Sequence, residues 1–343
     1  MRGAFHCAVW ASLVIAGCKP DAPARAPASS GSAAGTHRVA LPGGERGIGF
    51  DDLRFAAAIG KVVAPAGGTG TLALIDPRTD AVTAIAGFGT AAATGGHENG
   101  TTSADEGAGF LFAIDRTKLE VVVIAETSHA IVGRAALASS PDYVRWVEAT
   151  RELWVTEPDA DRIEVFALEA TTPRHAAFIA VAGGPESLVI AGTRAFTHLW
   201  RGKTVALDVT TRAITATWPN GCEDSRGIAL DPRRGWLFTG CAEGKATVLD
   251  IQTGALLGSL DVGAGVDVID YNPRLAHLYV PSAKTATLSI VGVGAGGTLA
   301  LLGTAPTSRG AHCVTADATD HAWVCDIRGG ALLAIADRYP ASE

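Results

Sequence analysis

The hydrophobic residues of this chain recur in short runs that are separated by polar turns. The clearest run is a few residues long and is often closed by Asp, as in Leu74-Ile75-Asp76 and Val248-Leu249-Asp250. Seven such runs have central residues between 41 and 49 positions apart, namely Ile75, Ile124, Phe166, Leu207, Leu249, Ile290 and Ile335. Runs this short fit β-strands, and the sequence shows no helical period longer than a turn or two.

The repeat length predicts the fold. A unit of roughly 40–45 residues built from short strands and turns is the signature of a β-propeller, in which each unit forms one four-stranded blade. Seven units therefore predict an all-β, seven-bladed β-propeller over residues 37–340. Such a fold grows by repetition rather than around a single core, which suits a segment of this length.

Turn residues divide each unit into strands. In the fifth unit Pro232-Arg233-Arg234-Gly235 and Thr253-Gly254 stand where turns favour Pro and Gly. The strands predicted for that unit cover residues 227–231, 236–241, 245–251 and 256–262. The seventh unit stops one strand short after Asp337, whereas His37–Leu41 precedes the first unit and is similar to a fourth strand. We expect His37–Leu41 to pair into the last blade, because this closes the ring and removes an exposed edge.

The first 36 residues differ from the repeats. A short positive start is followed by the apolar run Ala4–Ala16, which is too short to span a bilayer stably. Residues 1–18 are therefore predicted to be a signal peptide. They end in Ile15-Ala16-Gly17-Cys18, which resembles a bacterial lipobox, whose Cys is lipidated and becomes the first residue of the mature protein. The alternative is an ordinary secretory signal with a chance Cys at this place.

Residues 19–36 are rich in Pro, Ala, Ser and Gly, a composition that cannot bury a core and predicts a flexible tether. Lipidation at Cys18 implies a lipid-anchored protein of the cell envelope. We expect the outer membrane as its location, with the propeller facing the periplasm or the cell surface. The expected oligomeric state is a monomer.

Short motifs relate the repeats to a known family. Gly-Pro-x precedes an inner strand, Asp-Pro stands in the following turn, and apolar residues closed by Asp mark the third strand. This pattern resembles the YVTN-repeat, or YncE-like, propellers of bacteria within the WD40/YVTN repeat-like group. Tyr279-Val280-Pro281-Ser282 is a fragment of the family signature, and most other blades depart from it. The resemblance implies an exported or surface β-propeller and no particular activity.

One position is polar in all seven units when they are aligned at the start of the inner strand. Its residues, here named the predicted ring, are Asp51, Glu98, Asp142, Glu186, Arg226, Asp267 and His312. Inner strands line the central channel of a propeller, so equivalent residues are expected to surround one channel mouth. The predicted ring is the candidate ligand-binding site.

Carboxylates this close together raise one another's pKa or recruit a cation. Oxygen ligands suit Ca²⁺ or Mg²⁺, and His312 would also admit Zn²⁺. The possible metal ligands are Asp51, Glu98, Asp142, Glu186, Asp267 and His312. The alternative is a wet mouth with solvated charges. Arg226 can neutralise one carboxylate, which favours that alternative or an organic anion.

Four cysteines remain after Cys7 and Cys18 are set aside, and an even number in an exported protein predicts disulfides. Antiparallel pairing brings the start of an inner strand close to the end of its neighbour, which predicts Cys222–Cys241 and Cys313–Cys325 at the rim that carries the predicted ring. A metal site made of four cysteines is the alternative, but the sequence contains no CxxC motif.

Charge and motifs narrow the function. The net charge is −7 and no basic cluster is present, so nucleic acid is not an expected partner. The sequence contains no CxxCH, GxSxG, Walker or HExxH motif. We therefore favour a non-catalytic scaffold that binds an unknown small ligand or protein partner at the charged mouth. One alternative is a metal-dependent, lactonase-type hydrolase. Propellers of that kind typically add Asn ligands beside the acids, and the predicted ring contains no Asn. The other alternative is a redox accessory protein, for which the sequence shows no cofactor ligand.

Overall fold

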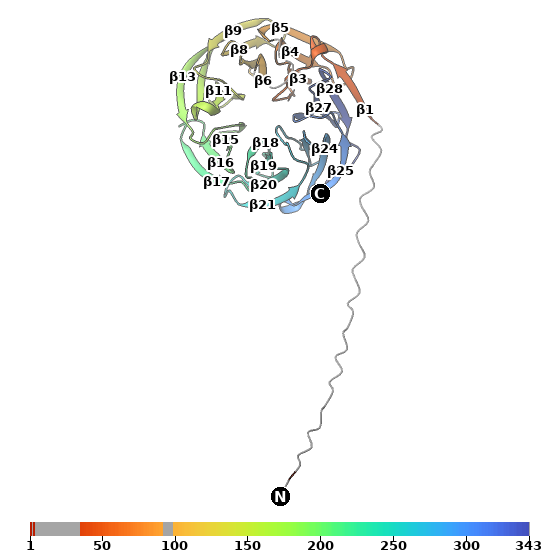
Figure 1. The fold of residues 1–343 in the computed structure, drawn as a ribbon. Helices are drawn as coiled ribbons and strands as arrows, with labels where there is room; N and C mark the ends of the chain where they lie inside the picture. The colour runs from red at the N-terminus through yellow and green to blue at the C-terminus, as the bar shows by residue number, and fades with distance from the viewer. Residues whose placement is uncertain (2, 4–34, 92–98, 343) are drawn as a thin grey trace. The chain divides into compact units, whose positions relative to one another are not determined.

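The computed structural model describes residues 35–91 and 99–342, together with Met1 and Gly3. The chain divides into a segment Met1–Ser30 and a compact unit Gly31–Glu343. Cys18, the rest of the predicted signal peptide apart from Met1 and Gly3, and nearly all of the predicted tether lie outside the described residues. The compact unit contains seven four-stranded antiparallel sheets arranged around a common axis (Figure 1). The predicted seven-bladed β-propeller is confirmed.

In six blades the strands follow chain order from the axis outward. Blades one to three consist of β2 (Arg54–Ala56), β3 (Lys61–Pro65), β4 (Thr69–Ile75) and β5 (Val82–Thr90), then β6 (Thr101–Gly107), β7 (Phe110–Asp115), β8 (Glu120–Ala125) and β9 (Ile131–Ala136), then β10 (Val144–Val147), β11 (Glu152–Glu157), β12 (Arg162–Glu169) and β13 (Thr172–Ala180). Blades four to six consist of β14 (Val189–Ala191), β15 (Arg194–Leu199), β16 (Lys203–Asp208) and β17 (Ile214–Pro219), then β18 (Ser225–Asp231), β19 (Trp236–Cys241), β20 (Lys245–Asp250) and β21 (Leu256–Asp261), then β22 (Asp270–Asn272), β23 (His277–Ser282), β24 (Thr287–Val293) and β25 (Leu299–Pro306). The four strands predicted for the fifth unit are each confirmed to within two residues.

Blade seven combines the two ends of the described unit. Its inner strands are β26 (Val314–Ala316), β27 (His321–Asp326) and β28 (Ala331–Ala336), and β1 (Thr36–Ala40) is the outer strand. The register runs from Thr36 opposite Ile335 to Ala40 opposite Ala331. The predicted closure by His37–Leu41 is confirmed, displaced by one residue.

Beyond β1, the backbones of Gly44 and Gly330 approach closely. A Cβ atom added to Gly44 would stand 2.4 Å from the Gly330 carbonyl oxygen. A larger residue at either glycine would therefore push the closing strand away from β28.

The hydrophobic core lies between the blades rather than at one centre. Seven buried clusters occupy the seven interfaces between neighbouring blades. Each cluster contains the residue at the middle of the second strand of one blade. These residues are Val63 and six aromatic residues: Phe112, Trp154, Phe196, Phe238, Tyr279 and Trp323. Each blade can bury this residue only against its neighbour, which is why the repeats stabilise one another.

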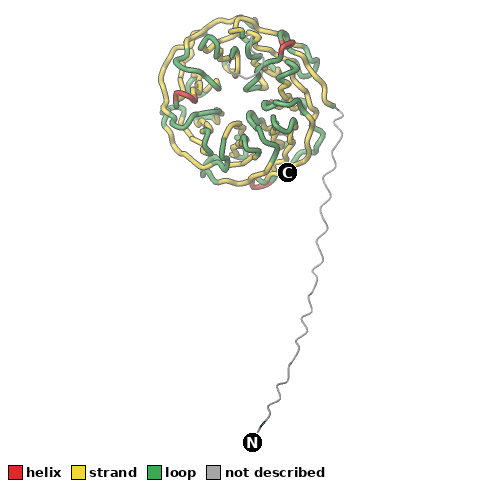
Figure 2. The backbone as a smooth tube through the Cα atoms, in the orientation of Figure 1, coloured by secondary structure: helices red, strands yellow, loops and turns green. Residues whose placement is uncertain are grey.

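Helical structure is confined to three short 3-10 turns in the described residues, η1 (Gly44–Arg46), η2 (Pro158–Ala160) and η3 (Ala295–Gly297) (Figure 2). None of the described helices has the length and hydropathy needed to cross a membrane. The functional surface must therefore be built from strand ends and loops.

Candidate functional site at the channel mouth

The predicted ring lies where the inner strands begin. Asp51 precedes β2 by three residues, Arg226 is the second residue of β18, and His312 precedes β26 by two. The pairing of the first two strands shows which residues of blades two and five are equivalent. Ser225 of β18 pairs with Cys241, and Thr101 of β6 pairs with Asp115, and a bulge follows each of these pairs. The position of Arg226 in blade five is therefore held by Thr102 in blade two.

This register corrects the alignment of blade two, which the sequence analysis placed at Glu98. Glu98 itself lies outside the described residues. The Gly-rich segment before Thr101 displaced the alignment by four residues, because its Gly-Gly-His-Glu run is similar to the Gly-Gly-Pro-Glu run that ends at Glu186. We call the channel end formed by Asp51, Thr102, Asp142, Glu186, Arg226, Asp267 and His312 the mouth.

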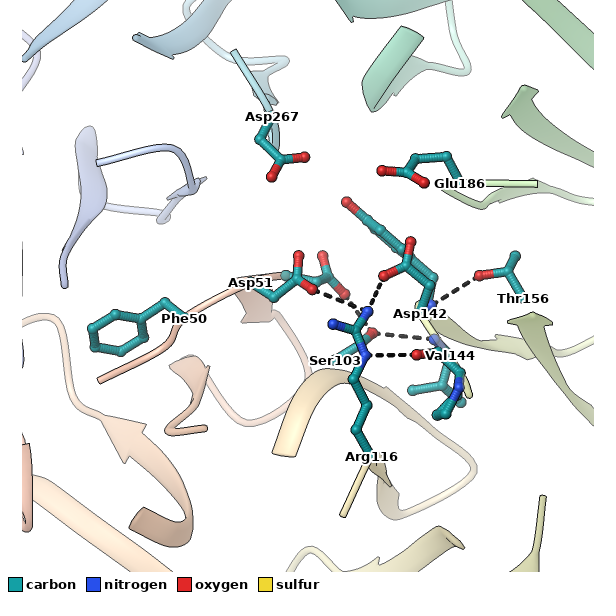
Figure 3. A network of polar contacts seen from close by, with 12 residues as sticks. Phe50, Asp51, Ser103, Arg116, Asp142, Val144, Thr156, Glu186 and Asp267 are labelled. Atoms are coloured by element: carbon teal, nitrogen blue, oxygen red, sulfur yellow. Dashed lines mark hydrogen bonds and ion pairs between the residues drawn. The ribbon is translucent and has the colours of Figure 1, made fainter. Parts of the chain in front are cut away.

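Arg116 is a guanidinium group at the mouth that the sequence analysis missed. It follows β7 directly, and its Nη2 forms an ion pair with Asp51 Oδ2 at 3.3 Å and a hydrogen-bonded pair with Asp142 (Figure 3). Its Nε donates to the Pro141 carbonyl oxygen at 2.6 Å. Because Asp51, Arg116 and Asp142 belong to blades one, two and three, this clamp joins three blades at their inner ends.

Burial governs the titration of the clamp. It raises the pKa of Asp142 well above its ordinary value, with Glu186 and Asp51 acting in the same direction and Arg116 opposing them. The carboxylates around Arg116 outweigh its burial and raise the guanidinium pKa. Like charges raise the pKa of Asp142, as expected, but burial contributes more to the rise than they do.

Glu186 and Arg226 form a second clamp. Arg226 Nη1 donates to Glu186 Oε1 at 2.6 Å, and its Nε lies 3.0 Å from Asp224 Oδ1. Trp200 Nε1 donates to the other oxygen of Glu186. Burial raises the pKa of Glu186, and Arg226 opposes this shift. Trp200 thus holds a mouth carboxylate in place.

His312 and Asp267 complete the mouth between blades six and seven. His312 Nδ1 lies 2.9 Å from the Gly310 carbonyl oxygen, and Nε2 lies 3.1 Å from the Phe50 carbonyl oxygen and 3.9 Å from Asp267 Oδ2. Both ring nitrogens therefore face oxygen acceptors. In this orientation both nitrogens lie against oxygen atoms of the chain.

A hollow of about 390 Å³ opens at the mouth beside blades five to seven. Its lining residues are Arg226, Ala242, Gly265, Val266, Asp267, Ala283, His312 and Ile327. The residue that follows the second strand is small in blades five and six (Ala242, Ala283), which leaves room for the hollow there, whereas Arg116 and Trp200 occupy this position in blades two and four. Comparing this position across the repeats would have singled out Arg116 from the sequence, but not the carboxylates that it contacts.

Two disulfides brace the mouth, as predicted. Cys222–Cys241 has a Cα separation of 5.3 Å, and Cys313–Cys325 has one of 5.6 Å. Cys313 directly follows His312, and Cys241 directly precedes Ala242. Each bridge thus holds the start of an inner strand against the end of the second strand beside a mouth residue.

The cation site expected at the predicted ring stays a prediction, since Glu98 lies outside the described residues. Four mouth carboxylates (Asp51, Asp142, Glu186, Asp267) face two guanidinium groups (Arg116, Arg226), so the local charge is −4 + 2 = −2. In this part of the chain, the only three metal-ligating side chains with ligand atoms within 4.8 Å are Cys222, Cys241 and Glu243, and the two sulfurs are bonded to each other. Arg116 fills the place between Asp51 and Asp142 that a cation would need. The hydrolase alternative depends on such a cation and stays a prediction.

No known family profile matches the chain, and no curated protein matches it. Its fold is similar to solved structures. A chain of the "Crystal Structure of Mitotic Checkpoint Complex" is 13% identical, with 95% of this chain and 99% of that chain covered and a TM-score of 0.72. "Kuenenia stuttgartiensis Hydrazine Synthase" is 11% identical, with 87% and 97% covered and a TM-score of 0.71. "Structure of U3-55K" is 11% identical, with 88% and 99% covered and a TM-score of 0.71.

These similarities show the fold alone. The chain is a seven-bladed β-propeller, and its fold is similar to the folds of these three solved structures. Its closer relation to the YVTN-repeat propellers stays a prediction. A propeller of this kind suits protein interaction, because its rigid blades present loops on two open faces.

Proposed function

We propose that this protein is an exported scaffold, tethered to the membrane by a lipid at Cys18, that binds a protein partner at the mouth. The observation that carries the proposal is the fixed ring of charges beside a hollow whose lining includes the small residues Ala242, Gly265 and Ala283. Arg116 and Trp200 hold the carboxylates of Asp142 and Glu186, and two disulfides hold the strand ends. A surface that is already ordered loses little entropy when it binds, which favours affinity.

The charge of the mouth indicates the partner's chemistry. A local charge of −2 attracts a basic segment and accelerates its association. The Asp267 side chain is 23% exposed and borders the hollow, so a partner's Lys or Arg can reach it. Ala283 and Ile327 leave an apolar wall for the stem of that side chain. We therefore expect a basic loop whose central side chain enters the hollow.

Site-specific photo-crosslinking in the native cell envelope tests partner binding. A photo-reactive residue replaces Ala283 in the hollow, and a matched control places it at Ile214, which is 46% exposed on the outer strand β17. We expect one discrete protein adduct at position 283 that Asp267→Asn reduces at least fivefold, and no adduct at 214. Equal adducts at both positions, or an adduct that ignores Asp267→Asn, would contradict the proposal.

Fractionation tests the tether. Cys18→Ala is expected to release the protein from membranes, because the apolar run ending in Ile15-Ala16-Gly17-Cys18 is then no longer a lipidation site. Ala16→Ser serves as the matched control, since it keeps the Cys and a small residue. If Cys18→Ala remains in the membrane fraction with its anchor, the lipoprotein proposal is wrong.

A further inference from the structure

A second cavity lies on the propeller axis, deeper than the mouth. Its volume is about 400 Å³, within the range of small-molecule sites. Its walls are the inner strands of blades one to six, and it extends to Pro232 in the turn after β18, at the end of the channel opposite the mouth. We call it the axial cavity.

One side of the axial cavity is charged. Four carboxylates and two guanidinium groups line it: Asp52, Asp105, Glu106, Asp270, Arg54 and Arg145. Arg145 is 3% exposed and donates to both oxygens of Asp52, at 2.7 and 3.0 Å, and to the Leu188 carbonyl oxygen at 2.9 Å. Arg54 donates to Asp105 at 3.0 Å. The lining therefore carries −4 + 2 = −2, with its guanidinium groups already engaged by carboxylates.

The opposite side is apolar. Val189 and Ile190 of blade four and Ile228, Ala229 and Leu230 of blade five face the cavity. Blade packing accounts for part of this wall, because Val189 and Ile228 belong to the buried cluster between blades four and five and Leu230 packs against it. The side of the wall that borders the cavity is apolar as well. The axial cavity thus has the two-sided lining of a site for an amphipathic molecule.

Tyr143 is the polar side chain aimed into this cavity without a bonding partner. It is 3% exposed and lines the axial cavity. Its backbone N–H donates to Thr156 Oγ1 at 2.9 Å, but its hydroxyl makes no hydrogen bond with any described residue. Arg145 lies over its ring, 4.8 Å from the centroid, and fixes its orientation. Burial raises the pKa of this phenol, and the nearby carboxylates of Asp52 and Asp51 add to the shift.

We propose that the axial cavity binds a small organic cation with an apolar body, of the alkylammonium class. The ammonium group donates to the Tyr143 hydroxyl oxygen and lies in the negative field of Glu106 and Asp270, because Arg145 and Arg54 already engage Asp52 and Asp105. Its apolar body lies against Val189, Ile228 and Leu230. A hydrogen bond from a charged donor to a buried, otherwise unbonded hydroxyl is among the stronger ones.

Electrostatics decide for a cation over an anion of the same shape. An anion would find both guanidinium groups engaged, Arg54 by Asp105 and Arg145 by Asp52, and it would face the carboxylates of Glu106 and Asp270. Moving a charge from water into such a cavity needs compensation by the opposite charge. The carboxylates supply this for an ammonium ion and oppose a carboxylate.

Three six-carbon probes separate these contributions: hexylammonium, hexanoate and 1-hexanol, titrated into the full protein by calorimetry at pH 7. Hexylammonium is expected to bind at least tenfold more tightly than the other two. Tyr143→Phe should weaken hexylammonium about tenfold without changing the melting temperature, because the hydroxyl has no bond to lose. Val189→Thr should weaken hexylammonium binding several-fold, because it makes the apolar wall polar. Glu106→Gln should weaken it several-fold as well, because it removes one negative charge.

Glu169→Gln is the matched control for the charge change, because Glu169 is 63% exposed on the outer face. It is expected to leave hexylammonium binding unchanged. Tighter binding of hexanoate than of hexylammonium would overturn the proposal, as would equal affinity in wild type and Tyr143→Phe. Failure of all three probes to bind would overturn it as well, whatever the outcome of crosslinking at Ala283.

Discussion

Replacing Arg116 by Met removes the charge that holds three blades together at the mouth and keeps the apolar stem of the side chain. Arg116 is 11% exposed as a side chain, and its partners Asp51 and Asp142 are 3% and 12% exposed. Breaking a buried ion pair by removing one partner costs about 3–5 kcal/mol, because the other charge stays buried without compensation. Here two carboxylates are left facing each other, so we expect the upper half of that range at pH 8.

The loss should depend on pH in a defined direction. Asp142 already has a raised pKa in the folded protein, and without Arg116 the pKa rises further. A carboxyl group whose pKa is higher in the folded than in the unfolded protein contributes most to the free energy of unfolding at pH values below its unfolded pKa. This contribution is lost as the pH rises through the folded pKa. The deficit of Arg116→Met is therefore largest at pH 8 and smaller at pH 5, where the carboxyl becomes protonated.

Urea unfolding followed by tryptophan fluorescence at pH 5 and pH 8 measures both effects. Arg174→Met is the matched control, since Arg174 pairs with Glu169 on the surface with both side chains 63% exposed, and it should cost less than about 1 kcal/mol. Adding Asp142→Asn to Arg116→Met should recover at least half of the loss. A cost below about 1 kcal/mol at pH 8, or the same cost at both pH values, would refute the reasoning.

Four further outcomes are expected. Deleting residues 36–44 removes β1 and exposes the edge of β28, so the protein should aggregate or melt at a much lower temperature; melting at the parent temperature in a thermal scan would disprove closure. Replacing Cys313 and Cys325 by Ala should cost about 2–4 kcal/mol in urea unfolding, and non-reducing peptide mapping of the parent should recover the Cys313–Cys325 peptide rather than a cross-blade one. Burial, with a hydrogen bond to Glu157, raises the pKa of Glu164 to about 7, so the contribution of Glu164 to stability is lost as the pH rises from 4.5 through 7. In urea unfolding, Glu164→Gln should be about 1–3 kcal/mol more stable than the parent at pH 8 and no more stable at pH 4. The reverse order would exclude the raised pKa. In calorimetric titrations with Ca²⁺, Mg²⁺ and Zn²⁺, Asp142→Asn should bind these ions no more weakly than the parent protein does. If the parent binds one of the ions clearly and Asp142→Asn does not, the mouth holds a cation site.

The repeat period and the turn residues were sufficient to predict the propeller, the number of blades and the closing strand. These features are local, since a strand of β-branched and aromatic residues between Pro and Gly turns forms in much the same way in every blade. The disulfide pairs followed from the same logic, because antiparallel pairing of Ser225 with Cys241 places strand ends side by side wherever the repeat occurs. Six of the seven predicted ring residues lie at the mouth for this reason.

The chemistry of the mouth was decided by tertiary structure. Asp51, Arg116 and Asp142 belong to three different blades, so no spacing within one repeat reveals that the guanidinium group lies between the two carboxylates. The same holds for Tyr143, whose hydroxyl lies among carboxylates from several blades. A repeat specifies which side chains point toward the axis, but the charge and shape at the axis depend on how unlike residues from different blades combine there. The sequence therefore determined six of the seven ring positions, and only the closed propeller decided which charges meet at the mouth.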